Sequence, residues 1–310
     1  MKKIIFLSMS ANFSPYIEEE EVVKETWAKD IIDGKYEGCS FYGYSASPNQ
    51  ENYTEGNHIY VDALDDLNGT YNKTYKCFKF LLENYDFDYI VRTNTSTYIN
   101  VQLVVDFINQ LPEDDDKIYC TRLIQRARRR DQFPGGRPAG LFFIMGRQVL
   151  DDVMEASKSI GRRVGVDDFM LFMCLYRLYH RRKIDWQSKI VCYDMRFPIW
   201  GINYSYEDYN GIFCARLKLH SEDRSNIIPL MQELHTAIQN EEKRFELPQH
   251  LSTQGVNYNY NAQPKPALKE EEMSKISMMS SPAVRRAILR RPLERGASNI
   301  RKRIQFRGVK

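Results

Sequence analysis

The chain has 310 residues and a formal net charge of +3, with 43% hydrophobic and 27% charged residues. These values exclude a wholly disordered chain, a collagen-like repeat and a coiled coil, and the length suits one large domain with an appendage. The charge is unevenly placed. Eleven basic residues and one acidic residue follow Met273, which leaves 33 basic and 40 acidic residues before it. A mildly acidic body (−7) therefore carries a strongly basic tail (+10).

The six cysteines are scattered along the chain, with no Cys-x-x-Cys pair and no Cys/His cluster at metal-binding spacing. Several lie in apolar runs, so we expect reduced thiols in the core and a reducing compartment. Residues 1–8 imitate a signal peptide, but their apolar run is too short for one and indicates a buried first strand. We therefore expect a cytoplasmic location, and peripheral attachment to the inner membrane face stays open.

Short apolar runs alternate with segments of helical periodicity, which is typical of an α/β domain. Strands are predicted at residues 4–7, 58–61, 88–92, 118–121, 141–145 and 190–193, and helices at residues 18–32, 74–84, 101–110, 148–157 and 167–179. The run at 88–92 is rich in β-branched and aromatic side chains, so it is expected to be a buried strand.

The composition changes near Pro248, where the chain becomes polar and rich in Asn, Gln, Ser and Pro. We predict a folded domain at residues 1–245, a polar linker at 246–281 and a basic tail with helical potential at 282–310. The tail favours an anionic membrane surface, at about 1 kcal/mol for each near-surface Lys or Arg. Plain disorder is an alternative. Nucleic acid is disfavoured, because the body lacks a basic face with interleaved aromatic residues.

A polar cluster, Arg92-Thr93-Asn94-Thr95-Ser96-Thr97, directly follows the strand predicted at 88–92. Open α/β sheets bind ligands outside the carboxyl ends of their strands, so this cluster predicts a ligand site. By the same argument Ser8 and Ser10, at the end of the first strand, are assigned to that pocket. The alternative is that residues 94–97 only cap the following helix.

Four segments between residues 4 and 220 resemble, in order and spacing, the GT-A nucleotide-sugar glycosyltransferases, especially the family 31 group of β1,3-galactosyltransferases and Fringe-like enzymes. They are Lys24-Glu25-Thr26-Trp27, the segment from Asp66 to Lys73-Thr74, the strand and polar cluster at residues 89–100, and residues 134–145 followed by Val166-Asp167-Asp168-Phe169. The resemblance implies a GT-A (Rossmann-like) α/β fold with a mixed, mostly parallel sheet and helices on both faces. It also implies an inverting hexosyltransferase that moves a sugar from a UDP-sugar donor to a glycan or lipid-linked hydroxyl, forming a β linkage.

The resemblance also assigns roles to residues. Asp168 takes the position of the family's catalytic base, which accepts the proton of the acceptor hydroxyl, and Asp167 takes that of the preceding acid. Arg92, Asn94 and Ser96 are assigned to the donor, and Gly135, Gly136 and Gly140 to a loop on the acceptor side. The alternative for the two aspartates is that they only stabilise the N-terminal end of their helix.

The chain departs from the family at the metal site. Three aspartates of the family bind Mn²⁺ there, whereas this chain has Asn94-Thr95-Ser96, and amide and hydroxyl groups are poor replacements for carboxylates. Two mechanisms stay open. In one, the diphosphate, water and His220, which resembles the family's C-terminal histidine ligand, hold Mn²⁺. In the other, no metal binds and cations neutralise the leaving UDP. The candidate cations are Arg92, Lys218, Arg126, Arg128, Arg129 and Arg130.

Two acidic runs, at residues 86–88 and 113–116, precede predicted strands and therefore lie at the wrong end of the sheet for this site; we expect them to be solvated turns. The competing function is that of a non-catalytic GT-A relative that binds a glycan or a nucleotide. Asp167-Asp168 is the feature that discriminates, because a binding protein has no chemical need for it.

Overall fold

The computed structural model describes residues 1–113, 115–121, 123–124, 133, 136–160, 165–192, 196–198, 213–218 and 224–240. Gly135, His220 and the four arginines at positions 126 and 128–130 lie outside these residues. The domain boundary predicted at residue 245, the polar linker and the basic tail also lie outside them. The predictions that concern these parts stay predictions.

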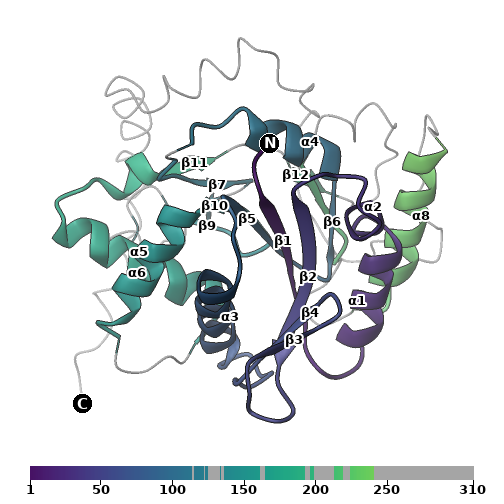
Figure 1. The fold of residues 1–310 in the computed structure, drawn as a ribbon, viewed down its shortest axis with the longest axis horizontal. Coiled ribbons are helices and arrows are strands. Elements are labelled where there is room, and N and C mark those ends of the chain that lie inside the picture. The colour runs from purple at the N-terminus through teal and green to yellow at the C-terminus, as the bar shows by residue number, and fades with distance from the viewer. Residues whose placement is uncertain are drawn as a thin grey trace, which may run out of the picture. The chain divides into compact units, whose positions relative to one another are not determined.

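Within the described residues, an eight-stranded sheet forms the centre of the fold (Figure 1). Its strands are β1 (Ile4–Met9), β2 (Cys39–Ala46), β3 (Tyr53–Glu55), β4 (His58–Val61), β5 (Tyr89–Asn94), β7 (Ile118–Cys120), β10 (Phe142–Gly146) and β11 (Ile190–Cys192). They lie in the order β11-β7-β10-β5-β1-β2-β4-β3. β4, β2, β1 and β5 are parallel, whereas β10 runs antiparallel to both of its neighbours, β5 and β7. This mixed, mostly parallel sheet confirms the predicted fold class.

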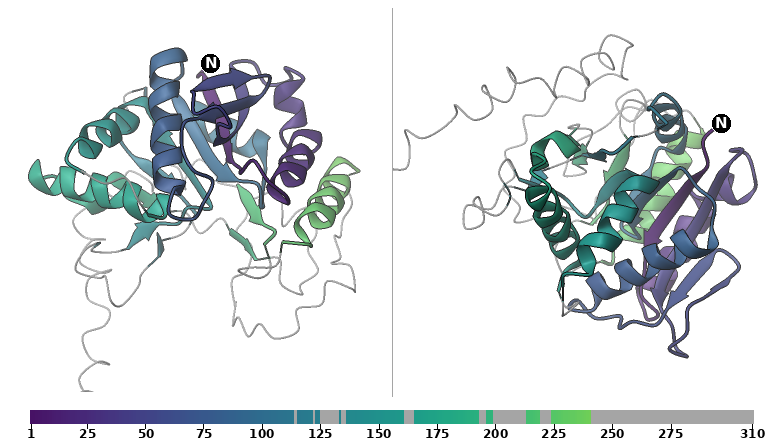
Figure 2. Two further views of the ribbon diagram at one scale, coloured as in Figure 1. Left: turned by 90° about the horizontal axis from the view of Figure 1, so that it is seen from below. Right: turned by 60° about the vertical axis from the view of Figure 1, so that its left-hand side comes forward.

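Helices cover both faces of the sheet (Figures 1 and 2). One face carries α3 (Thr70–Asn84), α5 (Arg147–Ser157) and α6 (Asp167–Arg181). The other carries α1 (Tyr16–Glu25), α2 (Lys29–Ile32) and α4 (Val101–Asn109), and α8 (Ile227–Gln239) packs against α1. No helix in the described part of the chain is both long enough and apolar enough to cross a bilayer.

Shorter elements complete the described structure. β6 (Thr97–Ile99), β13 (Cys214–Arg216) and β12 (Arg196–Pro198) form a three-stranded sheet, β8 (Leu123–Ile124) pairs with β9 (Arg137–Pro138), and a 3-10 helix spans Trp186–Lys189. A tight turn joins β5 to β6 at residues 95–96. The small sheet therefore brings residues 213–218 next to the polar cluster that follows β5.

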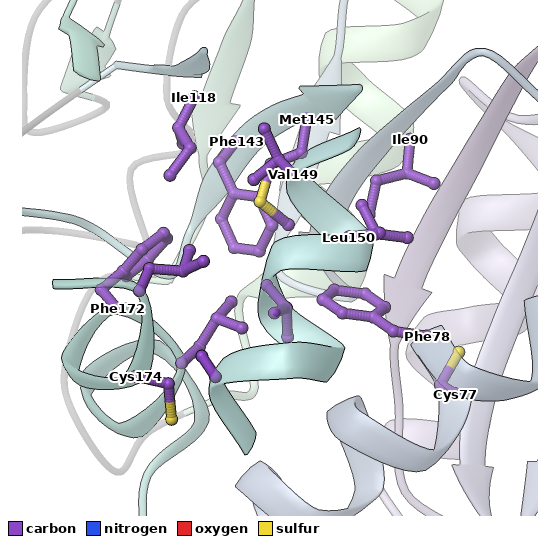
Figure 3. Close-up of a cluster of buried hydrophobic side chains, with 14 of the residues drawn as sticks. Cys77, Phe78, Ile90, Ile118, Phe143, Met145, Val149, Leu150, Phe172 and Cys174 are labelled. Carbon is purple, nitrogen blue, oxygen red and sulfur yellow. The ribbon is translucent and has the colours of Figure 1, made fainter. Parts of the chain in front are cut away.

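One apolar core lies between the sheet and helices α3, α5 and α6 (Figure 3). Side chains alternate along a strand with a period of two, so Ile5 and Leu7 of β1 face this core while Phe6 faces Trp27 on the other side. Phe143 of β10 meets Phe172 of α6 edge to face, with ring centroids 5.5 Å apart. Contacts of this kind fix α6, and with it Asp167 and Asp168, over the sheet.

The elements predicted from periodicity mostly agree with the structure, but one predicted helix is divided and several elements were not predicted, among them the short strands β3, β6, β8, β9, β12 and β13. The helix expected at 18–32 is divided into α1 and α2. The backbone leaves the helical conformation at Thr26 (φ −112°, ψ −114°), where the hydroxyl donates to the Val22 carbonyl at 2.6 Å. β2 and α8 were not predicted. β2 shows no alternation of polar and apolar residues, since it lies inside the sheet. Its Gly43 leaves room for the side chain of Glu20 in α1. A Cβ atom at position 43 would lie 2.2 Å from a Glu20 carboxylate oxygen.

The two acidic runs behave differently from each other. Asp86 forms an exposed ion pair with Lys3, as expected for a solvated turn. Asp115 contradicts the expectation, because it is buried and accepts hydrogen bonds from the Tyr119 hydroxyl and from the backbone N–H of Lys117. A buried carboxylate needs such donors, and here they anchor the chain before β7.

Candidate active site

The parallel strands β1, β2, β4 and β5 all end at one edge of the sheet, towards the bottom of Figure 1. Phe142, at the start of antiparallel β10, pairs with Thr93 near the end of β5, so Gly140 reaches the same edge. Asp167 and Asp168 are the first residues of α6 and arrive there as well. The structure thus brings together three segments that lie far apart in the sequence.

Arg92 and Asp167 form a buried ion pair at the centre of this edge. The Arg92 side chain is 1% exposed. Its guanidinium donates to an Asp167 carboxylate oxygen, to the Gly140 carbonyl and, at 3.2 Å, to the Tyr44 hydroxyl. Burial raises the pKa of the Asp167 carboxyl, and the charge of Arg92 opposes that rise. Arg92 therefore has its partners inside the protein, and its contact with a donor stays a prediction.

The Lys73-Thr74 segment supports this pair from α3. The Thr74 hydroxyl lies 3.1 Å from the Tyr44 hydroxyl and 3.5 Å from an Asp167 carboxylate oxygen. Lys73 is buried, and its ammonium donates to Asp65 at 2.7 Å and to the Ser10 carbonyl at 2.5 Å. These contacts tie the chain after β1 to the loop after β4, at the edge where the strands end.

Asp168 has one carboxylate oxygen held in place and one without a partner. Its Oδ2 forms an ion pair with Arg137 at 2.6 Å and accepts the Gly140 N–H at 3.2 Å. Its Oδ1 is buried and has no hydrogen-bond partner among the described residues. The Arg137 guanidinium also lies over the Phe169 ring, 5.7 Å from its centroid, which fixes its orientation. A buried carboxylate oxygen with no partner is unusual, and it marks Asp168 as a candidate functional group.

The polar side chains of the 94–96 turn all have hydrogen-bond partners within the protein. The Asn94 side-chain oxygen accepts the Ser96 hydroxyl at 2.8 Å and the Thr97 hydroxyl at 3.0 Å. The Thr95 hydroxyl donates to Glu19 of α1 at 2.5 Å. Amide and hydroxyl oxygens used in this way do not form a site for a hard cation, and the described residues contain no cluster of three potential metal-ligating side chains. These residues therefore do not fit Mn²⁺.

The buried Glu19 and the half-buried Arg224 form a second ion pair beside this turn, and the sequence interpretation missed both. Arg224 Nε lies 2.7 Å from Glu19 Oε1, and its guanidinium stacks over the Tyr16 ring at 4.2 Å. Glu19 could have been found, because it precedes Val22 and Val23 by three and four positions on the apolar side of the helix. Arg224 carried no local signal, since it meets Glu19 across 205 residues.

The other residues assigned to the donor lie around the same turn. The backbone N–H of Leu217 donates to the Ser96 carbonyl at 2.9 Å, which places the half-buried Lys218 next to the turn. The Ser8 hydroxyl is buried without a partner among the described residues, and the Ser10 hydroxyl donates to the Tyr16 carbonyl at 3.2 Å. In the loop that the resemblance assigns to the acceptor, Gly136 adopts a φ of +101°, which suits glycine, directly before Arg137.

No protein-family model and no characterised protein sequence matches the chain. Solved structures similar to it include the apo-form glycosyltransferase GlyE of Streptococcus pneumoniae TIGR4, at 13% identity over 78% of this chain and 63% of that chain, with a TM-score of 0.39. A glycosyltransferase involved in glycosylation of the PBCV-1 major capsid is 10% identical over 74% of this chain and 98% of that chain, with a TM-score of 0.42. The galactosyltransferase LgtC, in complex with donor and acceptor sugar analogs, is 11% identical over 80% of this chain and 98% of that chain, also with a TM-score of 0.42. Similarity at this level carries no conclusion about activity.

Proposed function

We propose that the chain is a glycosyltransferase that moves a sugar from a UDP-sugar to a hydroxyl of a glycan or lipid-linked acceptor, with inversion. The observation that carries this proposal is the geometry of Asp168. Arg137 and the Gly140 N–H hold one carboxylate oxygen, and the other oxygen is left without a partner among the described residues. A general base needs a fixed orientation and an oxygen that no other donor already occupies.

In the proposed step, the acceptor hydroxyl oxygen attacks the anomeric carbon on the face opposite the phosphate. The bond from that carbon to the phosphate oxygen breaks, and UDP leaves with the electron pair. The hydroxyl proton passes to Asp168 Oδ1, because Oδ2 is already engaged by the ion pair with Arg137 and by the Gly140 N–H. Attack from the opposite face converts an α-linked donor into a β-linked product. Asp167 acts indirectly, by fixing the start of α6 through its pair with Arg92.

The leaving diphosphate needs positive charge, and no step is assigned to a metal because the 94–96 turn does not fit one. Among the described cations near that turn, Arg224 donates to the Thr95 hydroxyl at 3.0 Å but is paired with Glu19. The half-buried Lys218 directly follows Leu217, whose backbone N–H donates to the Ser96 carbonyl. We assign the stabilisation of the leaving group to Lys218. An ammonium can serve as a point charge for a phosphate without a second ligand.

We expect metal chelation to leave the reaction intact. Because carboxylate ligands are missing at the turn, excess EDTA should change donor affinity and turnover by less than about twofold, whereas Lys218→Met should weaken binding of UDP about tenfold. Isothermal titration with UDP and a UDP-release assay, each with and without EDTA, measure both effects. Lys29→Met, at an exposed lysine outside the site, is the control. Abolition of turnover by EDTA would assign the reaction to a metal and return His220 to consideration as a ligand.

Gly140→Ala is expected to lower turnover about 10- to 100-fold by displacing Asp168. A Cβ at position 140 would lie 2.8 Å from Asp168 Cβ and 3.2 Å from Oδ2, and a small displacement of a catalytic group is costly. The matched control is Gly146→Ala, whose Cβ would lie 2.8 Å from the Asp115 carbonyl, outside the site. Both variants should lose about 1–3 kcal/mol of stability, but only Gly140→Ala should lose turnover per folded molecule. Equal turnover in the two variants would contradict the role of Asp168.

A second candidate function is that of a non-catalytic binding protein. It is favoured by one observation: four cations of this edge already have acidic partners, in the pairs Arg92–Asp167, Arg137–Asp168, Lys73–Asp65 and Arg224–Glu19. Such pairing leaves little charge for a diphosphate. The difference between the two functions is turnover, because a binding protein would bind the nucleotide or the glycan and release no UDP.

A panel of UDP- and GDP-sugars tests the proposal on the full chain. Thermal shift first identifies any donor that stabilises the protein, and UDP release in the presence of mono- and oligosaccharide acceptors then measures transfer. The anomeric proton coupling of the product in NMR reports the stereochemistry. A β-linked product supports the proposal, an α-linked product refutes inversion, and stabilisation without transfer favours the binding protein.

A further inference from the structure

Large apolar side chains are exposed on three segments of the chain, two loops and the loop-to-helix segment that leads into α1, at the edge that carries the candidate active site. Phe13 and Ile17 lie after β1, and their exposed fractions are 47% and 46%. Leu64 and Leu67 lie after β4, with exposed fractions of 67% and 69%. Val166 lies just before α6 and is 41% exposed. We call these five residues the apolar rim. Elsewhere in the described residues, the large apolar side chains that are exposed are Met1, Ile32 and Ile184.

Hydrogen bonds join the three segments to one another. The Asn12 N–H donates to Asp65 at 2.6 Å, which ties the loop of Phe13 to the loop of Leu64. The Gly165 N–H donates to the Asn68 carbonyl at 2.6 Å, and the Asp167 N–H donates to the Thr70 hydroxyl at 3.1 Å. The loops of Leu67 and Val166 are therefore tied as well. The apolar rim is a connected feature, and it borders Asp167 and Asp168.

The loop after β4 also carries three aspartates, and each has a partner within the protein. Asp62 pairs with Lys76, Asp65 pairs with Lys73, and Asp66 accepts the backbone N–H of Gly69. An unpaired carboxylate would oppose the approach of this loop to an apolar phase, because removing it from water is costly. Lysines therefore neutralise Asp62 and Asp65, which lowers the cost of bringing Leu64 and Leu67 to such a phase, whereas Asp66 stays exposed to water. Single exposed apolar residues are ordinary, but a connected group beside a site indicates a contact surface.

We propose that the apolar rim docks on the surface of a lipid bilayer that contains anionic headgroups. The choice of a bilayer rests on two observations. The exposed rim side chains lie on segments that hydrogen bonds join, and lysines neutralise Asp62 and Asp65 there. The same chain carries eleven basic residues and one acidic residue after Met273. The basic tail supplies a charge attraction to anionic lipid, and the rim supplies apolar burial in the interface. Two such signals together give stable attachment where one gives only weak attachment.

Docking deepens the proposed function, on which this part of the inference rests. The rim borders Asp168, so a docked molecule would hold its site at the level where a lipid-linked acceptor presents its hydroxyl. The acceptor class is then a glycan or sugar carried on a membrane lipid. The docking itself is measured without turnover, so a failure of the proposed function leaves the test of docking unaffected.

Sedimentation with vesicles tests the docking on the full chain. The vesicles contain phosphatidylcholine and phosphatidylglycerol at 7:3, and binding is measured in low salt and in high salt, where attraction through the tail is screened. The double variant Leu64→Ser and Leu67→Ser should lower the partition coefficient by about tenfold or more at both salt concentrations, because two largely exposed leucines lose their burial in lipid. The matched control is Ile32→Ser and Ile184→Ser, which removes two exposed apolar side chains outside the rim.

The control should bind vesicles within about twofold of the unmodified protein. Both double variants should keep the circular dichroism spectrum and the melting temperature of the parent within a few degrees, which shows that a loss of vesicle binding is not a loss of folding. Equal effects of the two variants, no effect of the rim variant, or no vesicle binding by the parent would each overturn the proposal. A parent dimer that the rim variant converts to a monomer, without vesicle binding, would assign the rim to a second copy of the chain and overturn it too.

Discussion

Asp168→Asn is expected to lower turnover by about 10²–10⁴-fold while binding of the UDP-sugar is retained. Asparagine has nearly the shape of aspartate, and its side-chain oxygen can still accept from Arg137 and from the Gly140 N–H. It cannot accept a proton from the acceptor hydroxyl near neutral pH. The substitution therefore removes the chemistry and keeps the geometry, which is why this effect on activity should be the largest.

Single-turnover transfer measures the loss for Asp168→Asn, and titration with the donor measures the affinity that remains. Asp152→Asn is the matched control, since Asp152 is also a buried carboxylate paired with an arginine, Arg182 at 2.8 Å, but lies on α5 among structural contacts. It should keep turnover within about twofold. If Asp168→Asn keeps more than a tenth of the parent turnover, Asp168 is not the base and the proposed step is wrong.

The largest expected effect on stability is that of Arg92→Met. This substitution leaves the Asp167 carboxylate buried without its cation and removes the donor to the Gly140 carbonyl. Breaking one side of a buried pair typically costs about 3–5 kcal/mol, because the remaining charge has no compensation. Denaturant unfolding should show a loss of this size in the free energy of unfolding. Methionine roughly preserves the volume, so the loss reports charge and hydrogen bonding more than packing.

Two further variants make the interpretation of Arg92→Met specific. Combining it with Asp167→Leu removes both charges and should recover a large part of the lost stability, since a buried pair can be replaced by apolar side chains at little cost. Lys29→Met breaks the exposed pair with Asp33 and should change stability by at most about 0.5 kcal/mol. If Arg92→Met is as mild as Lys29→Met but abolishes binding of UDP, Arg92 is a donor ligand as the resemblance implied, and its structural role is minor.

The sequence was informative where local pattern reflects burial. The runs that become β4, β5, α3 and α6 were placed within a few residues of their observed bounds, because a strand or helix of a layered fold repeats its apolar positions with a characteristic period. Asp167-Asp168 was correctly expected to open a helix, and the polar cluster after β5 to lie at the end of a buried strand. β2 escaped prediction because both of its faces are covered and small and polar residues interrupt its apolar run.

The sequence by itself therefore determined the α/β class, the order of the main elements and the segments that carry the candidate chemistry. Only the tertiary structure decided which side chains meet: Arg92 with Asp167, Arg137 with Asp168, and Glu19 with Arg224. The physical reason is that a charge recruits whichever partner the packing of helices and strands brings within hydrogen-bond distance, and that partner can lie anywhere in the chain. Local periodicity records which face of an element is buried, but not what the buried group touches.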